Sequence, residues 1–143
     1  MARALGDDWM LPEIVDSNRG WWTSGKLPIQ CCSDCGALQH PPEEVCGTCQ
    51  STRFGEHECK GEGRIESVAI VHHPVHPALA DFVPYAVVVV SLDDAPGVNV
   101  IGNVVGSPPD AIEIGAPVRA VFEEVTDPET GDELRIPQWE VAG

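Results

Sequence analysis

The residues most clearly able to do chemistry are cysteines, and five of the six lie between residues 31 and 49. Four of them form two C-x-x-C pairs, Cys32 with Cys35 and Cys46 with Cys49. A C-x-x-C turn directs two thiolates toward one ion, so two such turns predict a closed tetrahedral zinc site without an open position for a substrate. The ten residues between the pairs suit a tight hairpin, whose turn we place at Pro41-Pro42.

The other two cysteines leave one ambiguity. Cys31 could replace Cys32 as a ligand, but the pair would then lose its C-x-x-C spacing, so we interpret Cys31 as a strand residue and Cys59 as a small apolar residue. Gln50 follows the second pair, where glycine would turn more easily, but this change removes no ligand. We expect the zinc to be structural, because a lobe of about thirty residues has little core and metal binding can supply its folding free energy.

The sequence lacks the motifs of several other chemistries. It contains no G-x-S-x-G, H-E-x-x-H, P-loop or G-x-G-x-x-G pattern. His72, His73 and His76 gather in one segment, but Pro74 and Pro77 exclude a helix there, so their spacing does not predict a metal pair. We interpret these histidines as loop residues that lie either in solvent or at an interface.

These histidines belong to a thirteen-residue segment, 72–84, that lacks glycine and is rich in apolar residues. An apolar loop of this length usually covers something, either its own barrel or a partner or ligand, and we favour the partner or ligand. The predicted contact residues in and beside this segment are His72, His73, His76, Phe82 and Tyr85.

The segment before the cysteines predicts a short helix that opens at Pro12. One face of this helix would carry Ile14, Val15, Asn18, Trp21 and Trp22. Two interpretations stay open. The helix could merely cap the ribbon, or it could dock a partner. Docking is suggested because tryptophan is favoured at interface anchors, and three tryptophans give a lobe without a core a large aromatic surface. They are Trp9, Trp21 and Trp22.

The rest of the chain predicts a series of short strands. The 143 residues include 14 glycines and 13 prolines beside 43% apolar residues, which is typical of a loop-rich β protein. Five strands with regular turns fit a small barrel of the OB type, with strands at 64–71, 85–92, 98–105, 116–125 and 134–141. We therefore predict a mainly β chain with an N-terminal helical docking segment, a rubredoxin-like zinc ribbon and an OB-fold barrel, at 1–28, 29–60 and 61–143. Gly61-Glu62-Gly63 would be the hinge before the barrel.

The charge of the chain argues against several partners. It carries 8 basic and 23 acidic residues, a formal net charge of −15, and would not hold nucleic acid or an anionic membrane by charge. No run approaches the ~20 apolar residues of a membrane helix, and the first residues do not resemble a signal peptide. Clustered cysteines suit a reducing compartment, so we predict a cytoplasmic protein. A nucleic-acid-binding module stays as the alternative, on analogy of fold alone.

Longer motifs run in order along nearly the whole chain. In the first half they are Trp22, Gly25-Lys26-Leu27, Cys32-x-x-Cys35-Gly36 and Pro41-Pro42-x-x-x-Cys46-x-x-Cys49. In the second half they are Pro84-Tyr85, Ser91-Leu92-Asp93, Ile101-Gly102-Asn103-Val104-Val105 and Ile114-Gly115-x-Pro117-Val118-x-x-x-Phe122. Together they resemble a family that pairs a rubredoxin-like zinc ribbon with an OB fold, domain-of-unknown-function family number thirty-five. Gly47 and Gln50 depart from it, since the family often has Pro and Gly there.

The resemblance implies an accessory subunit for acyl-CoA chemistry. Members of the family accompany thiolase-superfamily enzymes, either archaeal acetoacetyl-CoA thiolase with hydroxymethylglutaryl-CoA synthase or bacterial thiolase-like aldolases. The setting that this chain resembles most is the domain attached to a MaoC-like enoyl-CoA hydratase in actinobacterial steroid side-chain breakdown. There the domain partners an aldolase that resembles lipid-transfer protein and cleaves a β-hydroxyacyl-CoA by retro-aldol chemistry.

This resemblance implies that the partner supplies the catalytic residues and that the chain is an obligate subunit of a lyase or thiolase complex. A CoA thioester would be a ligand shared with the partner, and Arg64, Arg119 and Arg135 are the barrel's only candidates for its phosphates. We expect two copies of each subunit, because thiolase-fold enzymes are usually dimers. Contacts to the partner or to acyl-CoA would then come from Trp21, Trp22, His72, His73, His76, Phe82 and Tyr85.

Overall fold

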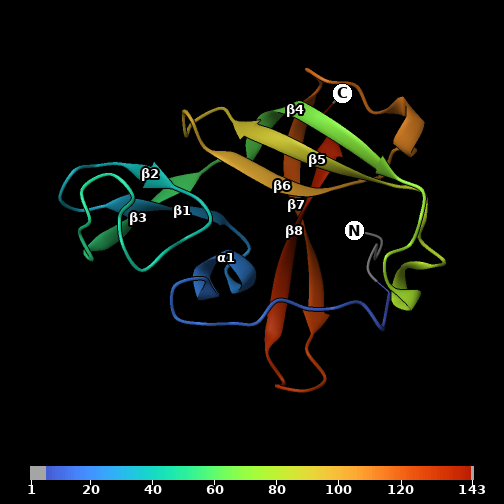
Figure 1. Cartoon of the computed structure of the whole chain (residues 1–143), viewed down its shortest axis with the longest axis horizontal. Coiled ribbons are helices and arrows are strands. Elements are labelled where there is room, and N and C mark those ends of the chain that lie inside the picture. Colours follow the sequence, from blue (N-terminus) through green and yellow to red (C-terminus); the bar gives the residue numbers. More distant parts are fainter. Residues whose placement is uncertain (1–5, 143) are drawn as a thin grey trace.

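The computed structural model describes residues 6–142 and contains two β units, a three-stranded ribbon and a five-stranded barrel (Figure 1). The ribbon sheet has the order β2-β1-β3, and the barrel has the order β4-β5-β6-β8-β7. The elements in chain order are α1 (Arg19–Thr23), β1 (Leu27–Cys32), β2 (Leu38–Gln39), β3 (Phe54–Cys59), β4 (Glu62–Val71), η1 (Pro77–Leu79), β5 (Tyr85–Leu92), β6 (Asn99–Val105), η2 (Pro109–Ala111), β7 (Pro117–Thr126) and β8 (Glu133–Val141). Among the described residues, no helix is long and apolar enough to cross a membrane.

The barrel forms where strands alternate buried and partly exposed side chains. In β5 every second residue from Ala86 to Leu92 is buried, so one face of the strand lines the core. Trp139 of β8 is only 1% exposed and fills the same core. β7 and β8 form a long antiparallel hairpin, and β4 pairs with both β5 and β7. The predicted mainly β architecture with a five-stranded barrel is confirmed.

The junction between ribbon and barrel is packed, so the predicted hinge is wrong. Gly61 and Gly63 are buried, and a Cβ at Gly63 would collide with the carbonyl oxygen of Ser91. The Lys60 N–H donates to Asp94 Oδ2 at 2.9 Å, and the His57 ring Nε2 lies 2.7 Å from the Asp94 carbonyl oxygen. Glycine is present here because backbones approach closely, and ribbon residues Leu27, Ile29 and Cys59 join the core cluster of the barrel.

The predicted short N-terminal helix is present, but it begins at Arg19 and not at Pro12. Among the described residues before β1, Arg19–Thr23 is the one helix, and the residues before it form a strap. The Asn18 side chain accepts from the Val15 N–H at 2.8 Å and donates to the Glu13 carbonyl at 2.9 Å, which satisfies the backbone in a non-helical conformation. The strap and α1 cover the outer face of the β7–β8 hairpin, where a second apolar cluster contains Leu11, Ile14, Trp22, Val125, Leu134 and Ile136.

Candidate metal centre and partner-contact residues

The four cysteines of the two C-x-x-C pairs converge at the outer end of the ribbon. Their sulfur atoms all lie within 4.8 Å of one another, with Sγ–Sγ distances of 3.5 Å for Cys32–Cys49 and 3.7 Å for Cys35–Cys46. A tetrahedron with Zn–S bonds of about 2.3 Å has edges of roughly 3.8 Å. The donor set therefore fits one zinc ion with four thiolates, which leaves no coordination position for a substrate.

Two similar turns position the sulfur atoms. The Gly36 N–H donates to the Cys32 carbonyl and the Gln50 N–H donates to the Cys46 carbonyl, both at 2.9 Å. Gly36 has φ 76° and Gln50 has φ 62°, so both turns end in the left-handed region. Gln50 is the one non-glycine residue with positive φ in the described chain, which confirms that this departure strains the backbone and removes no ligand.

Backbone N–H groups favour the thiolate form of the first cysteine in each turn, Cys32 and Cys46, whereas the neighbouring thiols of the cluster raise the pKa of Cys35 and Cys49. The N–H of Cys35 lowers the pKa of Cys32 to about 6, which favours the thiolate that zinc binds. The backbone N–H groups of Cys49 and then Thr48, the latter 3.4 Å from Cys46 Sγ, lower the pKa of Cys46. When bound, zinc would hold the two turns together, and this closed arrangement makes its role structural.

The other two cysteines lie outside this cluster. Cys31 is half-buried in β1, and its sulfur is nearest to the carbonyl oxygens of Cys32 and Gly36. Cys59 is buried in the core, where desolvation and the neighbouring Asp94 raise its pKa to about 12. A thiol with such a pKa is a poor nucleophile, and its position agrees with the interpretation of Cys59 as a small apolar residue.

Trp21 is placed differently from the exposed anchor that the sequence suggested. It is only 6% exposed, and its ring packs against His40 at 4.3 Å and against Trp22 at 6.5 Å. Burial lowers the pKa of His40 to about 4, and its Nδ1 is buried without a hydrogen-bond partner within the described residues. Trp21 therefore joins ribbon to barrel, and little of its ring is left for a partner.

The loop over residues 72–84 partly covers its own barrel and the strap. Phe82 packs edge-on against Trp9 at 5.2 Å between ring centroids, and Tyr85 lies 6.4 Å from the same ring. The His76 Nδ1 accepts from the Ala78 N–H at 3.1 Å and so caps η1. His72 and His73 are exposed.

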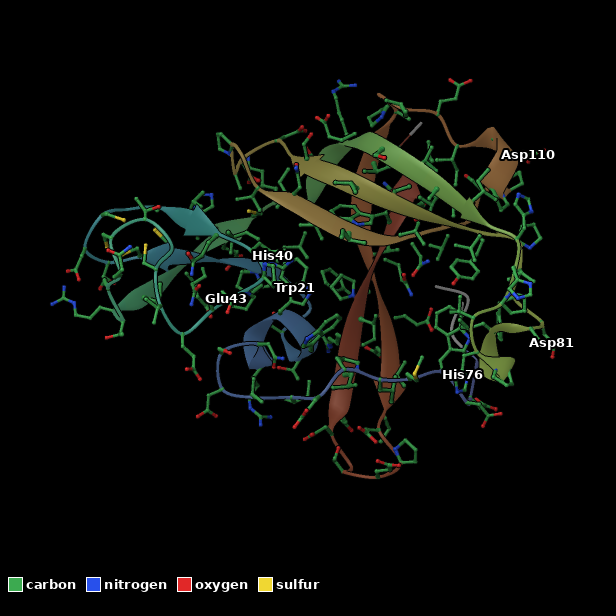
Figure 2. The ribbon with its side chains drawn as sticks, in the orientation of Figure 1. Trp21, His40, Glu43, His76, Asp81 and Asp110 are labelled. Carbon is green, nitrogen blue, oxygen red and sulfur yellow. The ribbon has the colours of Figure 1, made fainter. Side chains whose placement is uncertain are left out.

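The predicted contact residues thus fall into two groups. Figure 2 shows Trp21 beside His40 and Glu43 near the ribbon, whereas His76 and Asp81 lie on the opposite side of the molecule. Within residues 6–142 the cysteine cluster is the one grouping of His, Cys, Asp and Glu able to hold a metal. Sequence reasoning missed the pairing of His40 with Trp21 and of Trp9 with Phe82, since both join segments far apart in the chain.

The three barrel arginines are already engaged. Arg119 pairs with Glu140 at 3.1 Å, and Arg135 pairs with Glu124 at 3.8 Å. Arg64 donates to the Gly115 carbonyl at 3.1 Å. Exposed ion pairs of this kind are weak, so each arginine could turn toward a phosphate. In the contacts described here, however, the three arginines do not bind at one common anion site.

Comparison with known proteins places this zinc site and barrel in one class. The ChsH2 rubredoxin-like zinc ribbon domain matches residues 22–55, and the ChsH2 C-terminal OB-fold domain matches residues 56–123. A DUF35 domain-containing scaffold protein of Methanothermobacter thermautotrophicus is 33% identical over 97 residues, which are 67% of this chain and 71% of that protein. The chain belongs to the DUF35 family, as its motifs predicted.

Further relatives indicate which members of the family this chain resembles. The solved Ltp2-ChsH2(DUF35) aldolase aligns over 93% of this chain and 100% of its own, with a TM-score of 0.74 and 35% identity. The probable enoyl-CoA hydratase alpha subunit of Thermomonospora curvata is 40% identical over 121 residues. The 3-oxo-4,17-pregnadiene-20-carboxyl-CoA hydratase alpha subunit of Mycobacterium tuberculosis is 30% identical over 124 residues. The matches cover 82% and 85% of this chain but only 36% and 38% of these two hydratase subunits.

Proposed function

We propose that this chain is a non-catalytic subunit of a thiolase-fold aldolase that cleaves a β-hydroxyacyl-CoA. The observation that carries the proposal is the likeness to the Ltp2-ChsH2(DUF35) aldolase, which extends over the whole length of the aligned chain of that structure. The scaffold name of the archaeal relative supports the same role. In this assembly the chain supports the folding of the enzyme and contributes to the acyl-CoA site.

The chemistry would belong to the partner. A retro-aldol reaction removes a proton from the β-hydroxyl group and breaks the Cα–Cβ bond. The oxygen forms the new carbonyl group, the bonding electrons pass to Cα as a thioester enolate, and protonation of Cα gives the shortened acyl-CoA. The first step needs a general base beside the β-hydroxyl group, and we assign that base to the partner. The residues of this chain would therefore bind and orient, and the CoA would be shared with the partner.

The name of one relative supports a substrate class for this proposal. The hydratase subunit of Mycobacterium tuberculosis is named for a steroid carboxyl-CoA, and hydration of an enoyl-CoA yields the β-hydroxyacyl-CoA that a retro-aldolase consumes. We propose that the chain acts in steroid side-chain degradation in the cytoplasm, beside a MaoC-like hydratase. The assembly would contain two copies of this chain and two of the aldolase.

Co-expression with a thiolase-like aldolase from the same source tests this proposal. We expect one species with the mass of two plus two subunits in light scattering, and retro-aldol activity that the aldolase lacks when expressed alone. As matched controls, Cys32→Ser should lose zinc, whereas Cys31→Ser should keep both the zinc and the complex. Two separate species, with an aldolase fully active alone, would overturn the proposal.

A further inference from the structure

One stretch of the barrel wall is open. β6 pairs with β5 through residues 99–103, but its other edge pairs with β8 only at Val104 and Val105. The lower part of β8 pairs with β7 alone. Figure 1 shows the β7–β8 hairpin running away from β6 at this point. Over residues 99–103, β6 therefore presents an edge without a strand partner among the described residues, and such an edge is a template for another extended segment.

This opening is hollow and uncharged. Two cavities of about 200 Å³ and 110 Å³ share Trp9, Asn103 and Gln138 as lining residues. No Asp, Glu, Lys or Arg lines either cavity, although the chain as a whole has a net charge of −15. Met10 and Ile101 line the larger cavity, and each is 72% exposed. An apolar, uncharged hollow with exposed apolar residues at its mouth fits an uncharged protein segment better than an ionic ligand.

Three polar side chains line the same hollow, and they offer hydrogen-bonding groups to an occupant. Gln138 is only 2% exposed, and it lines both cavities. The indole Nε1 of Trp9 is buried without a partner among the described residues. Asn103 donates through Nδ2 to the Ala86 carbonyl at 3.2 Å, which leaves its Oδ1 as an acceptor. Buried polar groups are normally hydrogen-bonded, so these donors and acceptors match those of a peptide backbone.

We propose that the opening between β6 and β8 is where an extended, uncharged segment of the aldolase subunit docks. The backbone of the segment would extend the free edge of β6, a carbonyl would accept from Trp9 Nε1, and a peptide group would pair with Gln138. An apolar side chain would lie against Met10 and Ile101. This inference rests on the proposed function, since it assigns a surface to the same partner.

The test uses two isoleucines of nearly equal exposure. Ile101 is 72% exposed at the hollow, and Ile114 is 67% exposed and lines neither cavity. Ile101→Lys should weaken the complex by about tenfold or more, because it places a charge in the uncharged contact, while Ile114→Lys should change affinity less than about twofold. Equal thermal midpoints of the two variants show that both still fold.

Hydrogen exchange of the intact complex gives a second readout. Backbone amides of residues 99–103 should exchange more slowly in the complex than in the chain alone. A complex that forms without this protection and tolerates Ile101→Lys overturns the docking surface but leaves the proposed function standing. Failure of the wild-type chain to form any complex overturns the proposed function and this inference with it.

Discussion

The ribbon and the barrel are both built mainly from antiparallel strands, but different forces hold them together. Between residues 33 and 58, the outer ribbon has a single buried residue, Cys46. The barrel buries a continuous apolar cluster in which Val88 and Val90 have no exposed surface and Ile65 has 1%. Each such side chain contributes about 1.5–3 kcal/mol on burial, whereas the outer ribbon must rely on its metal.

The comparison shows which contacts stabilise the ribbon and which stabilise the barrel. The inner end of β1 contributes Leu27 and Ile29 to the core that Trp139 fills, so the ribbon is anchored in the barrel. The barrel, in turn, receives nothing from the cysteine cluster. We therefore expect the outer ribbon to unfold without loss of the barrel, but not the reverse.

The largest effect is expected from loss of the metal. Cys46→Ser removes one of four thiolates and should abolish zinc binding, whose free energy is on the order of 10 kcal/mol in small zinc domains. Zinc content should fall from one ion per chain to none, and hydrogen exchange should become rapid over residues 33–58 while β5 and β8 stay protected. If residues 33–58 and the barrel strands lost their protection from hydrogen exchange to the same extent, the outer ribbon would not unfold independently of the barrel.

A matched control for this change is Cys31→Ser. Cys31 lies next to a proposed ligand in the sequence, but its sulfur is outside the cluster. This variant should keep the full zinc content and an exchange pattern like that of the wild type. Loss of zinc here would mean that Cys31, and not Cys32, is the ligand.

The second effect tests the barrel side of the comparison. Trp139 is 1% exposed, and Trp139→Ala should lower the free energy of unfolding by about 3–5 kcal/mol through loss of burial and formation of a cavity. Urea denaturation followed by circular dichroism measures this loss. Val75→Ala, at a residue that is 82% exposed, should change stability by less than about 0.5 kcal/mol. If Trp139→Ala lowered the free energy of unfolding as little as Val75→Ala does, the barrel would not depend on its apolar core.

The third effect concerns the junction and depends on pH. Burial holds the pKa of His40 at about 4, whereas an unfolded histidine has a pKa of about 6.5. Because the unfolded state binds the proton more readily, His40 should cost stability as pH falls from about 6.5 toward 4, by on the order of 1–3 kcal/mol after allowance for its partial exposure.

His40→Phe measures this contribution. The phenyl ring can keep the packing against Trp21 but cannot be protonated. Its stability advantage over the wild type should grow as pH is lowered from 7 to 4.5, while acid release of zinc affects both proteins and cancels in the difference. A difference that does not change with pH would show that His40 is not titrating from a buried state.

The two regions also differ in how far the sequence predicts them. The metal centre could be predicted because the spacing of Cys32, Cys35, Cys46 and Cys49 is local, and so could the strands, because alternation in β5 is local. The predicted short helix is present, but it begins at Arg19 and not at Pro12, because Asn18 makes local side-chain bonds to the backbone. The hinge at Gly61 was wrong, because the close approach there depends on distant segments. Asn18 diverts the backbone of the strap, and the glycines allow a close approach of β4 to β5.

The smallest effect is expected from substitutions in the two turns of the metal centre, which should change its zinc affinity only slightly. Gly36 and Gln50 occupy similar left-handed positions, with φ of 76° and 62°. A Cβ at Gly36 would meet nothing within 4 Å, so Gly36→Gln should cost only the conformational penalty of about 1–2 kcal/mol. Gln50→Gly should relieve the same strain but make the unfolded chain more flexible, for a net gain below about 1 kcal/mol. Competition with a chelator should therefore rank zinc affinity as Gln50→Gly, wild type, then Gly36→Gln. The reverse order would mean that the glutamine side chain stabilises the second turn in a way that outweighs its backbone strain.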